Sequence, residues 1–540
     1  MRQPTLLRSA AVVSVAVSLS RITGMVREMV MARLFGAGEV YDAFLLGIRI
    51  PNLTRNLFAE GTLSSAFVPA FTQHLREGKL EAQKLSDLVA TALLIAVGAA
   101  CLLGIVFTPQ LVHVLAPGFA AVPGKFELAV RLTRIMFPFL LLVALAAHAM
   151  GLLNACDRYG VPALASAWFN VASVLFGLAL GFVFHHSLIE SMAWGVLAGG
   201  LVQLVWQLPS VHRAGFGFRP RIDFRHPGVR RIARLMLPAF IGSSALQINI
   251  VVNTNLASRL TDTSGHVLNG PVSWLNYAFR FLQLPLGVFG AAIASATLPR
   301  ISRSAAGHEL AEFRSTLAHA IGTSLLLAIP SSIGLALFGE SMIAVVYQGG
   351  RFQAFDTHQT AMALACYSAG LAGFSLTKIL APAFYALDDG RTPMLVSIAS
   401  VAVNAAAAFA LVRWAGLGHA GLALSVSLVA LLSAAALFEL LRRRLAGLGG
   451  RALASSASRI LAASAVMAVV CAVAAATLPE PTSRLTHAGR LATVIPLGVA
   501  TFYATARALR VPELEALRAA CYTSSRNAPR PEVGDPFAGH

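Results

Sequence analysis

The chain has 540 residues, of which 56% are hydrophobic and 12% are charged, and its mean hydropathy is +0.70. A soluble globular protein carries roughly twice that share of charged residues, so the composition excludes an ordinary soluble domain and favours a membrane protein. The net charge of +18 would suit nucleic-acid binding, but most basic residues lie in short connections beside apolar stretches. No platform of basic and aromatic residues for bases is present, so nucleic acid is not expected as a partner.

Apolar stretches of about 20 residues or more recur along the chain, each long enough for a hydrocarbon layer roughly 30 Å thick. Because the backbone must satisfy its own hydrogen bonds in lipid, these stretches are expected to be helices. The predicted fold class is an all-α polytopic membrane protein with about fourteen transmembrane helices. The expected spans are 7–33, 41–70, 86–109, 128–154, 161–184, 190–210, 229–260, 270–298, 317–338, 358–386, 393–413, 418–440, 457–477 and 489–508.

Basic residues divide unevenly between the two sets of connections. One set carries most of them: Arg76, Lys79, Lys84, Arg213, Arg219, Arg221, Arg225, Arg230, Arg231, Arg234, Arg300, Arg303, Arg314, Arg442, Arg443, Arg444, Arg451 and Arg459. The opposite set holds little beyond Lys125, Arg351 and Arg484. This asymmetry predicts that both termini and the even-to-odd connections are cytoplasmic. The first span, which contains Arg21, Arg27 and Glu28, is interpreted as a retained helix rather than a cleaved signal.

A short internal repeat suggests two similar halves. The pentapeptide from Ser65 to Pro69 closes the second span, and a similar one from Ser295 to Pro299 closes the eighth. Each follows a helix with an intramembrane arginine and a proline, and parallel six-helix repeats are a known transporter design. We therefore predict an N-terminal lobe at 1–212, a C-terminal lobe at 213–445, two further helices at 446–509 and a polar cytoplasmic tail at 510–540.

The most informative feature is charge inside the first two spans. Ionisable residues lie within them or near their ends: Arg21, Arg27, Glu28, Asp42, Arg49, Arg55 and Glu60. A charge at the bilayer centre costs at least about 2.5–3.5 kcal/mol, so these side chains are expected to face a shared polar cavity. Helical spacing agrees, because Ser14, Ser18, Arg21, Met25 and Glu28 form one stripe and Ser20, Gly24 and Arg27 its neighbour. Arg280 and Lys378 add cations from the second half.

Arginines gathered in a cavity with few acids are suited to a diphosphate, because a guanidinium can grip phosphate oxygens with two parallel bonds. The alternative is that some of them form structural pairs, with Arg27 or Arg21 bound to Glu28 and Arg49 bound to Asp42. If the arginines are not paired in this way, they could together bind an anionic head group. Both interpretations stay open from sequence alone.

Other chemical motifs are weak. Neither Gly-Lys pair fits a phosphate-binding loop, and the histidines and five cysteines lack metal-ligand spacing, so no metal and no cofactor is expected. Whether an ion is coupled to transport stays open. The seventh span is unusually polar, with Gln247, Asn249, Asn253 and Asn255. These residues could line a cavity, bond neighbouring helices or hold an ion.

Several motifs resemble those of the MurJ (MviN) family of the MOP exporter superfamily. They lie at Ser20–Glu28, Ala32–Gly38, Asp42–Phe44, Pro51–Arg55 with Asn52, Phe58–Gly61, Ser65–Pro69, Ala116–Phe119, Gln207–Pro209, Val272–Trp274 with Ser273 and Arg280, and Lys378–Tyr385. The resemblance runs from about residue 5 to 510. Three positions depart from the family pattern: Glu28 stands where Asp is common, and Phe279 and Gln283 stand where some relatives carry acids.

The resemblance implies a fourteen-helix flippase with two six-helix lobes around a central cavity and a lipid-tail groove at 446–509. Its implied substrate is lipid II, the undecaprenyl-diphosphate-linked peptidoglycan precursor, moved from the cytoplasmic to the periplasmic leaflet of the bacterial inner membrane. Functional residues of the family match Arg21, Arg27, Asp42, Arg55 and Arg280, and we add Glu28 as a substrate-site residue. Supporting positions are Ser20, Arg49, Asn52, Glu60, Ser273 and Lys378.

We therefore expect a transporter that works by alternating access and changes no chemical bond, and hence is not an enzyme. Its expected partners are lipid II, membrane lipids and, as an open question, the peptidoglycan synthesis machinery. Three alternatives are weighed: a flippase for another lipid-linked sugar, a cation-coupled multidrug exporter of the same superfamily, and a membrane glycosyltransferase. The exporter would need cavity carboxylates, and the transferase would need an acidic surface site that Asp87, Asp157, Asp388 and Asp389 do not form. A purely structural scaffold also stays open from sequence, although such costly buried charges argue against it.

Overall fold

A computed structural model describes residues 6–59, 62–223, 225–262, 264–287, 291–307, 309–516 and 518. This part of the chain is helical, with two isolated β-bridges and no longer strand. The helices are α1 Leu6–Phe35, α2 Glu39–Ala59, α3 Thr62–Glu77, α4 Lys79–Val106, α5 Thr108–Leu115, the 3-10 helix η1 Pro117–Ala121, α6 Lys125–Met136, α7 Phe139–Ala155, α8 Gly160–Val183, α9 Leu188–Val205, α10 Leu208–Arg213, α11 Pro227–Ser258, α12 Pro271–Pro285, α13 Ala291–Ala306, α14 Leu310–Val346, α15 Ala354–Ser368, α16 Leu371–Ala386, α17 Arg391–Arg413, α18 Gly418–Arg444, α19 Gly450–Thr477 and α20 Arg484–Ala508.

Each of the fourteen predicted spans corresponds to one helix or to two consecutive helices, which confirms the polytopic all-α class. Among the described residues, nine segments are long and apolar enough to cross a membrane, and the bent pair α15 and α16 would make ten. The spans that do not pass this test are α1, α2 with α3, α11, and α12 with α13. These are the spans in which we predict intramembrane charges or a run of polar residues.

Prolines account for breaks inside several spans. Pro138 lies between α6 and α7, and Pro209 stands at the start of α10. Proline has no backbone N–H to donate, so the helical ladder is interrupted there. The internal repeat extends to secondary structure, because α2 followed by α3 and α12 followed by α13 show the same succession, with Pro69 inside α3 and Pro299 inside α13.

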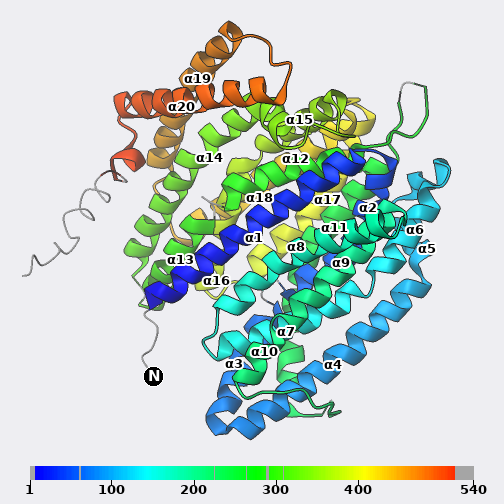
Figure 1. Ribbon diagram of the computed structural model, residues 1–540. Helices are drawn as coiled ribbons and strands as arrows, with labels where there is room; N and C mark the ends of the chain where they lie inside the picture. The colour runs from blue at the N-terminus through cyan, green and yellow to red at the C-terminus, as the bar shows by residue number, and fades with distance from the viewer. Residues whose placement is uncertain are drawn as a thin grey trace, which may run out of the picture. The chain divides into compact units, whose positions relative to one another are not determined.

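The chain divides into two compact units that do not follow a single cut in the sequence. The first comprises 1–278, 343–363 and 397–426, and the second comprises 279–342, 364–396 and 427–540. The predicted lobes at 1–212 and 213–445 stay a prediction. In the first unit α1 packs along α8, and α2 packs on α6 and α7 (Figure 1). A core around Phe67, Phe71, Leu85 and Leu153 holds α3, α4 and α7 together.

In the second unit α13 packs on α16, and α19 packs on α20 (Figure 1). One core joins Phe313, Leu317, Leu380 and Leu441, and another contains Ile460 and Val511. The predicted polar tail therefore begins with an anchored turn, since Val511 is buried and the buried Glu513 accepts a hydrogen bond from Ser456. Apart from residue 518, the tail beyond 516 lies outside the described residues.

Candidate functional site

The two polar stripes of α1 have different surroundings. Ser14, Ser18 and Arg21 are exposed, whereas the neighbouring stripe faces α8. There Asn170 donates to the Ser20 carbonyl at 3.2 Å, and the Arg27 guanidinium lies 5.5 Å from the centre of the Phe169 ring. Apolar side chains such as Val15 and Ile22 are exposed on the same face of α1, and Glu28 of the Arg21 stripe is buried. The shared polar cavity expected from the sequence therefore stays a prediction.

Arg27 forms one of the structural pairs considered from sequence. Its guanidinium contacts the Glu28 carboxylate at 3.2 Å, and the two side chains are 16% and 7% exposed. Tyr41 on α2 donates to the other oxygen of Glu28 at 3.2 Å. Tyr41 is itself fixed by stacking on Tyr277 with ring centres 5.1 Å apart. Glu28 thus orients Arg27 and is oriented by α2, while part of the Arg27 side chain stays accessible.

Asp42 lies in a sealed cluster near the start of α2, which we term the Asp42 cluster: Asp42, Lys125, Asn269, Gly270 and Ser273. Lys125 and Asp42 form an ion pair at 3.0 Å, with side chains that are 0% and 1% exposed. The Asp42 carboxylate also accepts from the Gly270 N–H at 2.9 Å, the Ser273 N–H at 2.9 Å and the Ser273 hydroxyl at 2.6 Å. Both oxygens of the Asp42 carboxylate are thus fully hydrogen-bonded by protein groups, and its charge is balanced by Lys125. The carboxylate also caps the first turn of α12.

The lysine of this cluster is held on two further sides. Its ammonium donates to the Asn269 side chain at 2.8 Å and lies 4.3 Å from the centre of the Phe119 ring. The sequence suggests a pair between Arg49 and Asp42, but in the structure Asp42 forms its ion pair with Lys125. Arg49 instead donates to the Thr254 hydroxyl on α11.

Close backbone contacts adjoin the Asp42 cluster in the chain. Trp274, next to Ser273, donates to Asp356 at 3.1 Å. Gly36 has a φ of +66°, and a Cβ added there would lie 2.5 Å from the Arg351 carbonyl oxygen. The Arg351 N–H donates to the Arg33 carbonyl at 3.0 Å. Helices α1, α2, α12 and α15 are therefore joined near one end by bonds that leave no room for a larger residue at Gly36.

For some of the predicted site residues, the structure does not assign a role to the side chain. Arg55 lies in α2 and Glu60 after it, and both fall outside the residues whose side chains are described. Asn52 is half-buried, and its side-chain oxygen has no hydrogen-bond partner among the described residues. Roles for these three positions stay predictions.

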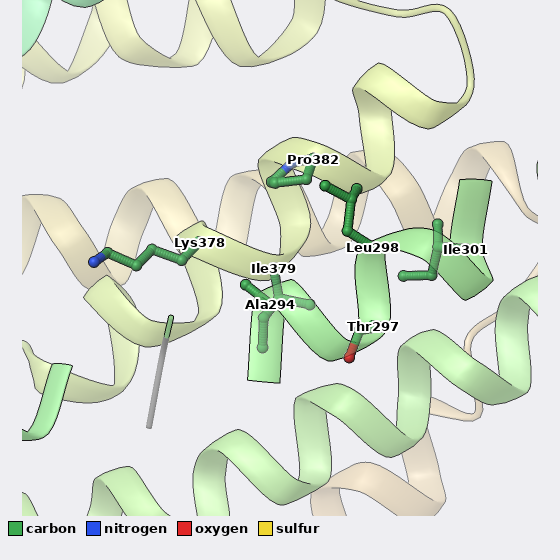
Figure 2. Close-up of a pocket in the computed structure, with 7 residues that line it drawn as sticks. All are labelled: Ala294, Thr297, Leu298, Ile301, Lys378, Ile379 and Pro382. Atoms are coloured by element: carbon green, nitrogen blue, oxygen red, sulfur yellow. The ribbon is translucent and has the colours of Figure 1, made fainter. Parts of the chain in front are cut away.

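The two predicted cations of the second half lie in the second unit. Arg280 is exposed near the end of α12. Lys378 is exposed on α16 and borders a small pocket between α13 and α16 (Figure 2). In Figure 2 the ammonium end of Lys378 extends away from Thr297 and Ile301, and apart from the Thr297 hydroxyl the rest of the pocket wall is apolar. This pocket does not have the composition of a diphosphate receptor.

The polar residues of the seventh span are used mainly between helices. Asn404 donates to Asn253 at 3.0 Å, and Ser425 donates to Asn404 at 3.2 Å. Asn255 donates to the Val114 carbonyl at 2.7 Å. Of the interpretations left open, helix–helix hydrogen bonding is the one that these contacts support. Within the described residues, no group of three His, Cys, Asp or Glu side chains could hold a metal ion.

Sequence reasoning missed Lys125, Asn269 and Tyr41. In the sequence Lys125 stands only as a basic residue of an outer connection, and Tyr41 stands at the start of an apolar stretch. A usable signal was present for Lys125, since it is one of few basic residues on the outer side and Asp42 is expected near the same side. The spacing of residues along a helix could not reveal a partner that is 83 residues away.

The described residues form many long apolar helices, with charged side chains on the first of them, and so define a polytopic membrane protein. The fold matches that of a solved structure described as "Lipid II flippase MurJ, inward closed conformation", with a TM-score of 0.76, 23% identity, and coverage of 92% of this chain and 99% of that one. An inward-facing multidrug transporter of the MATE family, in the MOP superfamily, matches with a TM-score of 0.65 and 14% identity over 80% of this chain and 94% of that one.

Sequence comparison then separates these two groups. The family model "Lipid II flippase MurJ" matches residues 31–486. The protein named lipid II flippase MurJ from Burkholderia cenocepacia is 37% identical over 440 residues, which is 80% of this chain and 83% of the relative. The chain belongs to the MurJ family.

Proposed function

We propose that this protein moves lipid II from the cytoplasmic to the periplasmic leaflet of the bacterial inner membrane. The observation that carries the proposal is the match to the MurJ family over residues 31–486, together with a relative of that name at 37% identity. The transported molecule changes leaflet and no covalent bond changes, so the protein acts as a transporter rather than an enzyme. We further propose cytoplasmic termini, on the strength of the uneven distribution of basic residues.

The physical difficulty of this transport lies in the head group. A polyisoprenyl tail is at home in the bilayer, whereas a diphosphate bearing sugar and peptide is not. We assign the diphosphate to Arg21, Arg27, Arg55 and Arg280, because guanidinium groups bind phosphate oxygens strongly and stay charged. The exposed Arg21 and the partly exposed Arg27 support this assignment on α1. The remaining substrate contacts and rocking of the lobes belong to the same proposal.

Glu28 has a distinct part in this proposal. It holds the Arg27 guanidinium in place before substrate arrives, and a diphosphate would then compete with it for the same N–H donors. The hydrogen bond from Tyr41 keeps the carboxylate where it is when Arg27 turns toward substrate. Glu28 would therefore set the affinity of Arg27 for the diphosphate without contacting it.

Asp42 is proposed to act through structure in this conformation. Its cluster ties α2 and α6, from the predicted N-terminal lobe, to the first turn of α12, from the predicted C-terminal lobe. Alternating access requires one end of the transporter to be closed while the other is open. The Asp42 cluster has the burial and the hydrogen-bond saturation expected of such a closed end.

The flippase assignment can be tested in cells depleted of their own lipid II flippase. Arg27→Ala and Arg280→Ala are expected to abolish growth and the outward appearance of lipid II, because each removes a phosphate-binding group. Arg443→Ala is the matched control, since this side chain is 74% exposed and its ion pair is on the surface. Normal outward lipid II with both test variants would refute the diphosphate assignment.

A second experiment addresses substrate and driving force. Purified protein in vesicles is supplied with labelled lipid II, and lipid-linked O-antigen sugar or a cationic drug is added as competitor. We expect competition only from diphosphate-linked lipids. Repeating the assay with and without sodium, a proton gradient and a membrane voltage identifies the coupling ion, if one is used. Inhibition by the cationic drug alone would favour the multidrug exporter.

A further inference from the structure

The connection between α10 and α11 is an extended strap that lies along α4, and we term residues 214–223 the linker strap. Between Gly217 and Arg221, every second backbone N–H of this strap donates a hydrogen bond to a side chain of α4, and the three accepting residues are four positions apart in that helix. The Gly217 N–H donates to Gln83 at 3.0 Å, the Arg219 N–H to Asp87 at 3.0 Å, and the Arg221 N–H to Thr91 at 3.0 Å. Four helical residues rise about 6 Å, and two extended residues span about 6.6 Å, so the two repeats stay in register.

The strap is also fixed at its start. Gln83 donates back to the Gly217 carbonyl at 2.8 Å. Phe216 is buried and packs edge-on against Phe71, with ring centres 5.3 Å apart. Backbone bonds thus hold the strap, which leaves most of its side chains uncommitted to the fold.

Those side chains combine positive charge with apolar surface. Phe218 is 54% exposed and Ile222 is 71% exposed. Arg219 and Arg225 are exposed beside them, and the described acid in this stretch is Asp223. Exposed aromatic and aliphatic side chains among arginines are unfavourable in water but suited to the boundary between head groups and acyl chains. The segment joins the sixth and seventh predicted spans, so it lies at the membrane surface on the side with most basic residues.

The start of α11 adds to this charge. Arg230 and Arg231 lie near the first turn of a helix that has no acidic residue there. Cations at a helix N-terminus are opposed by the helix dipole, so an anion bound nearby would relieve both the dipole and the arginines. Arg231 also donates to Gln73 at 2.8 Å, which fixes it toward α3.

We propose that the linker strap and the first turn of α11 form a docking surface for anionic phospholipid head groups of the cytoplasmic leaflet. Arg219, Arg225 and Arg230 meet the phosphates, while Phe218 and Ile222 enter the acyl boundary. The strap joins the two predicted lobes. A lipid bound to it would therefore hold this connection at a fixed depth in the membrane. This surface is separate from the proposed lipid II site and does not depend on the flippase assignment.

The test uses the full-length protein in nanodiscs that contain spin-labelled phosphatidylglycerol or spin-labelled phosphatidylcholine. The test variant is Arg219→Gln/Arg225→Gln/Arg230→Gln. Arg221 is left in place because it lies 3.6 Å from the buried Asp87 carboxylate. Each arginine near an anionic surface contributes about fivefold to binding, so the triple variant should lose most of its preference for phosphatidylglycerol. High salt should have the same effect on the parent protein.

The control is Arg131→Gln, which removes an exposed arginine that is paired with Glu190 in the span that begins on the predicted outer side. It should keep the parent preference for phosphatidylglycerol. A second variant, Phe218→Ser/Ile222→Ser, should weaken immobilisation of both labelled lipids while leaving the strap bonded to α4. An unchanged phosphatidylglycerol preference in the triple arginine variant would overturn the proposal, as would an equal loss in the control.

Discussion

Two charged regions of the first unit behave in opposite ways. The Arg27–Glu28 pair on α1 keeps 16% of the arginine side chain exposed, whereas Lys125 and Asp42 are 0% and 1% exposed. In the first region the cation has one recorded carboxylate partner and an aromatic neighbour. In the second, every part of the carboxylate is met by a protein donor. A charge in a membrane helix therefore indicates a ligand site only where its hydrogen-bonding capacity is left unfilled.

The largest expected effect comes from opening the sealed region. Lys125→Met would leave Asp42 buried without its counter-charge, which should cost about 3–5 kcal/mol of unfolding free energy. Arg131→Met is the matched control on the same helix, because its pair with Glu190 is partly exposed and surface pairs contribute at most about 1 kcal/mol. Reversible unfolding in bicelles measures both. Asp42→Asn/Lys125→Met should recover part of the loss, and equal stability of the two single variants would contradict the comparison.

The accessible region should show its effect on binding instead. Arg27→Ala/Glu28→Gln removes the pair together, so no carboxylate is left buried and unmatched. Loss of a charge-assisted contact of about 1.5–3 kcal/mol should weaken lipid II binding by roughly 10- to 100-fold. Titration of labelled lipid II into purified protein measures this change, with Arg131→Ala as the control. Glu28→Gln alone should tighten binding, and weaker binding with that variant would show that Glu28 contacts substrate itself.

A smaller effect is expected from the tyrosine behind the pair. Tyr41→Phe removes the donor to Glu28 and keeps the ring that stacks on Tyr277, so it should cost about 0.5–1.5 kcal/mol of stability. Glu28→Asp shortens the carboxylate and should lose the same bond, so the two changes together should cost little more than either one. Additive losses would mean that Tyr41 and Glu28 act separately. Tyr159→Phe, whose partner Asp157 is exposed, serves as the control.

The smallest expected effect lies in the neutral amide contact. Asn404→Leu should cost about 0.6 kcal/mol, because hydrogen bonds between membrane helices are weak on average. The same unfolding assay applies. A loss above the value measured for Lys125→Met would show that the amide contact between α11 and α17 is more important than the sealed ion pair.

The helices could be predicted from sequence because hydrophobic length is a local property. Each apolar stretch shows its own span, whereas the breaks beside Pro138 and Pro209 are found only in the structure. Arg27 and Glu28 could be paired in advance for the same reason, since they are neighbours in the chain. The seventh span shows where this reasoning stops, because its asparagines look alike in sequence whether they line a cavity or contact α17.

Partners that are distant in the chain could not be predicted from spacing along a helix. The bond between Asp42 and Lys125 depends on how α2 and α6 pack, and the bond between Asp42 and Ser273 crosses 231 residues. By hydropathy Lys125 is an ordinary loop cation, which serves only to orient the helices in the membrane. Its role in neutralising Asp42 is therefore not visible in the hydropathy pattern. The family resemblance suggested that Asp42 is functional, but it did not distinguish contact with substrate from closure of one end.

The packing of α1 along α8 has a consequence for how the protein is made. Arg21, Arg27 and Glu28 make α1 costly to place in lipid by itself, at about 2.5–3.5 kcal/mol for each central charge. The helix that covers Arg27 and the Ser20 carbonyl begins at Gly160, long after α1 ends at Phe35. Helix α1 is synthesised well before α8 and must therefore wait, sheltered by the insertion machinery or at the bilayer surface, until α8 arrives to pack against it.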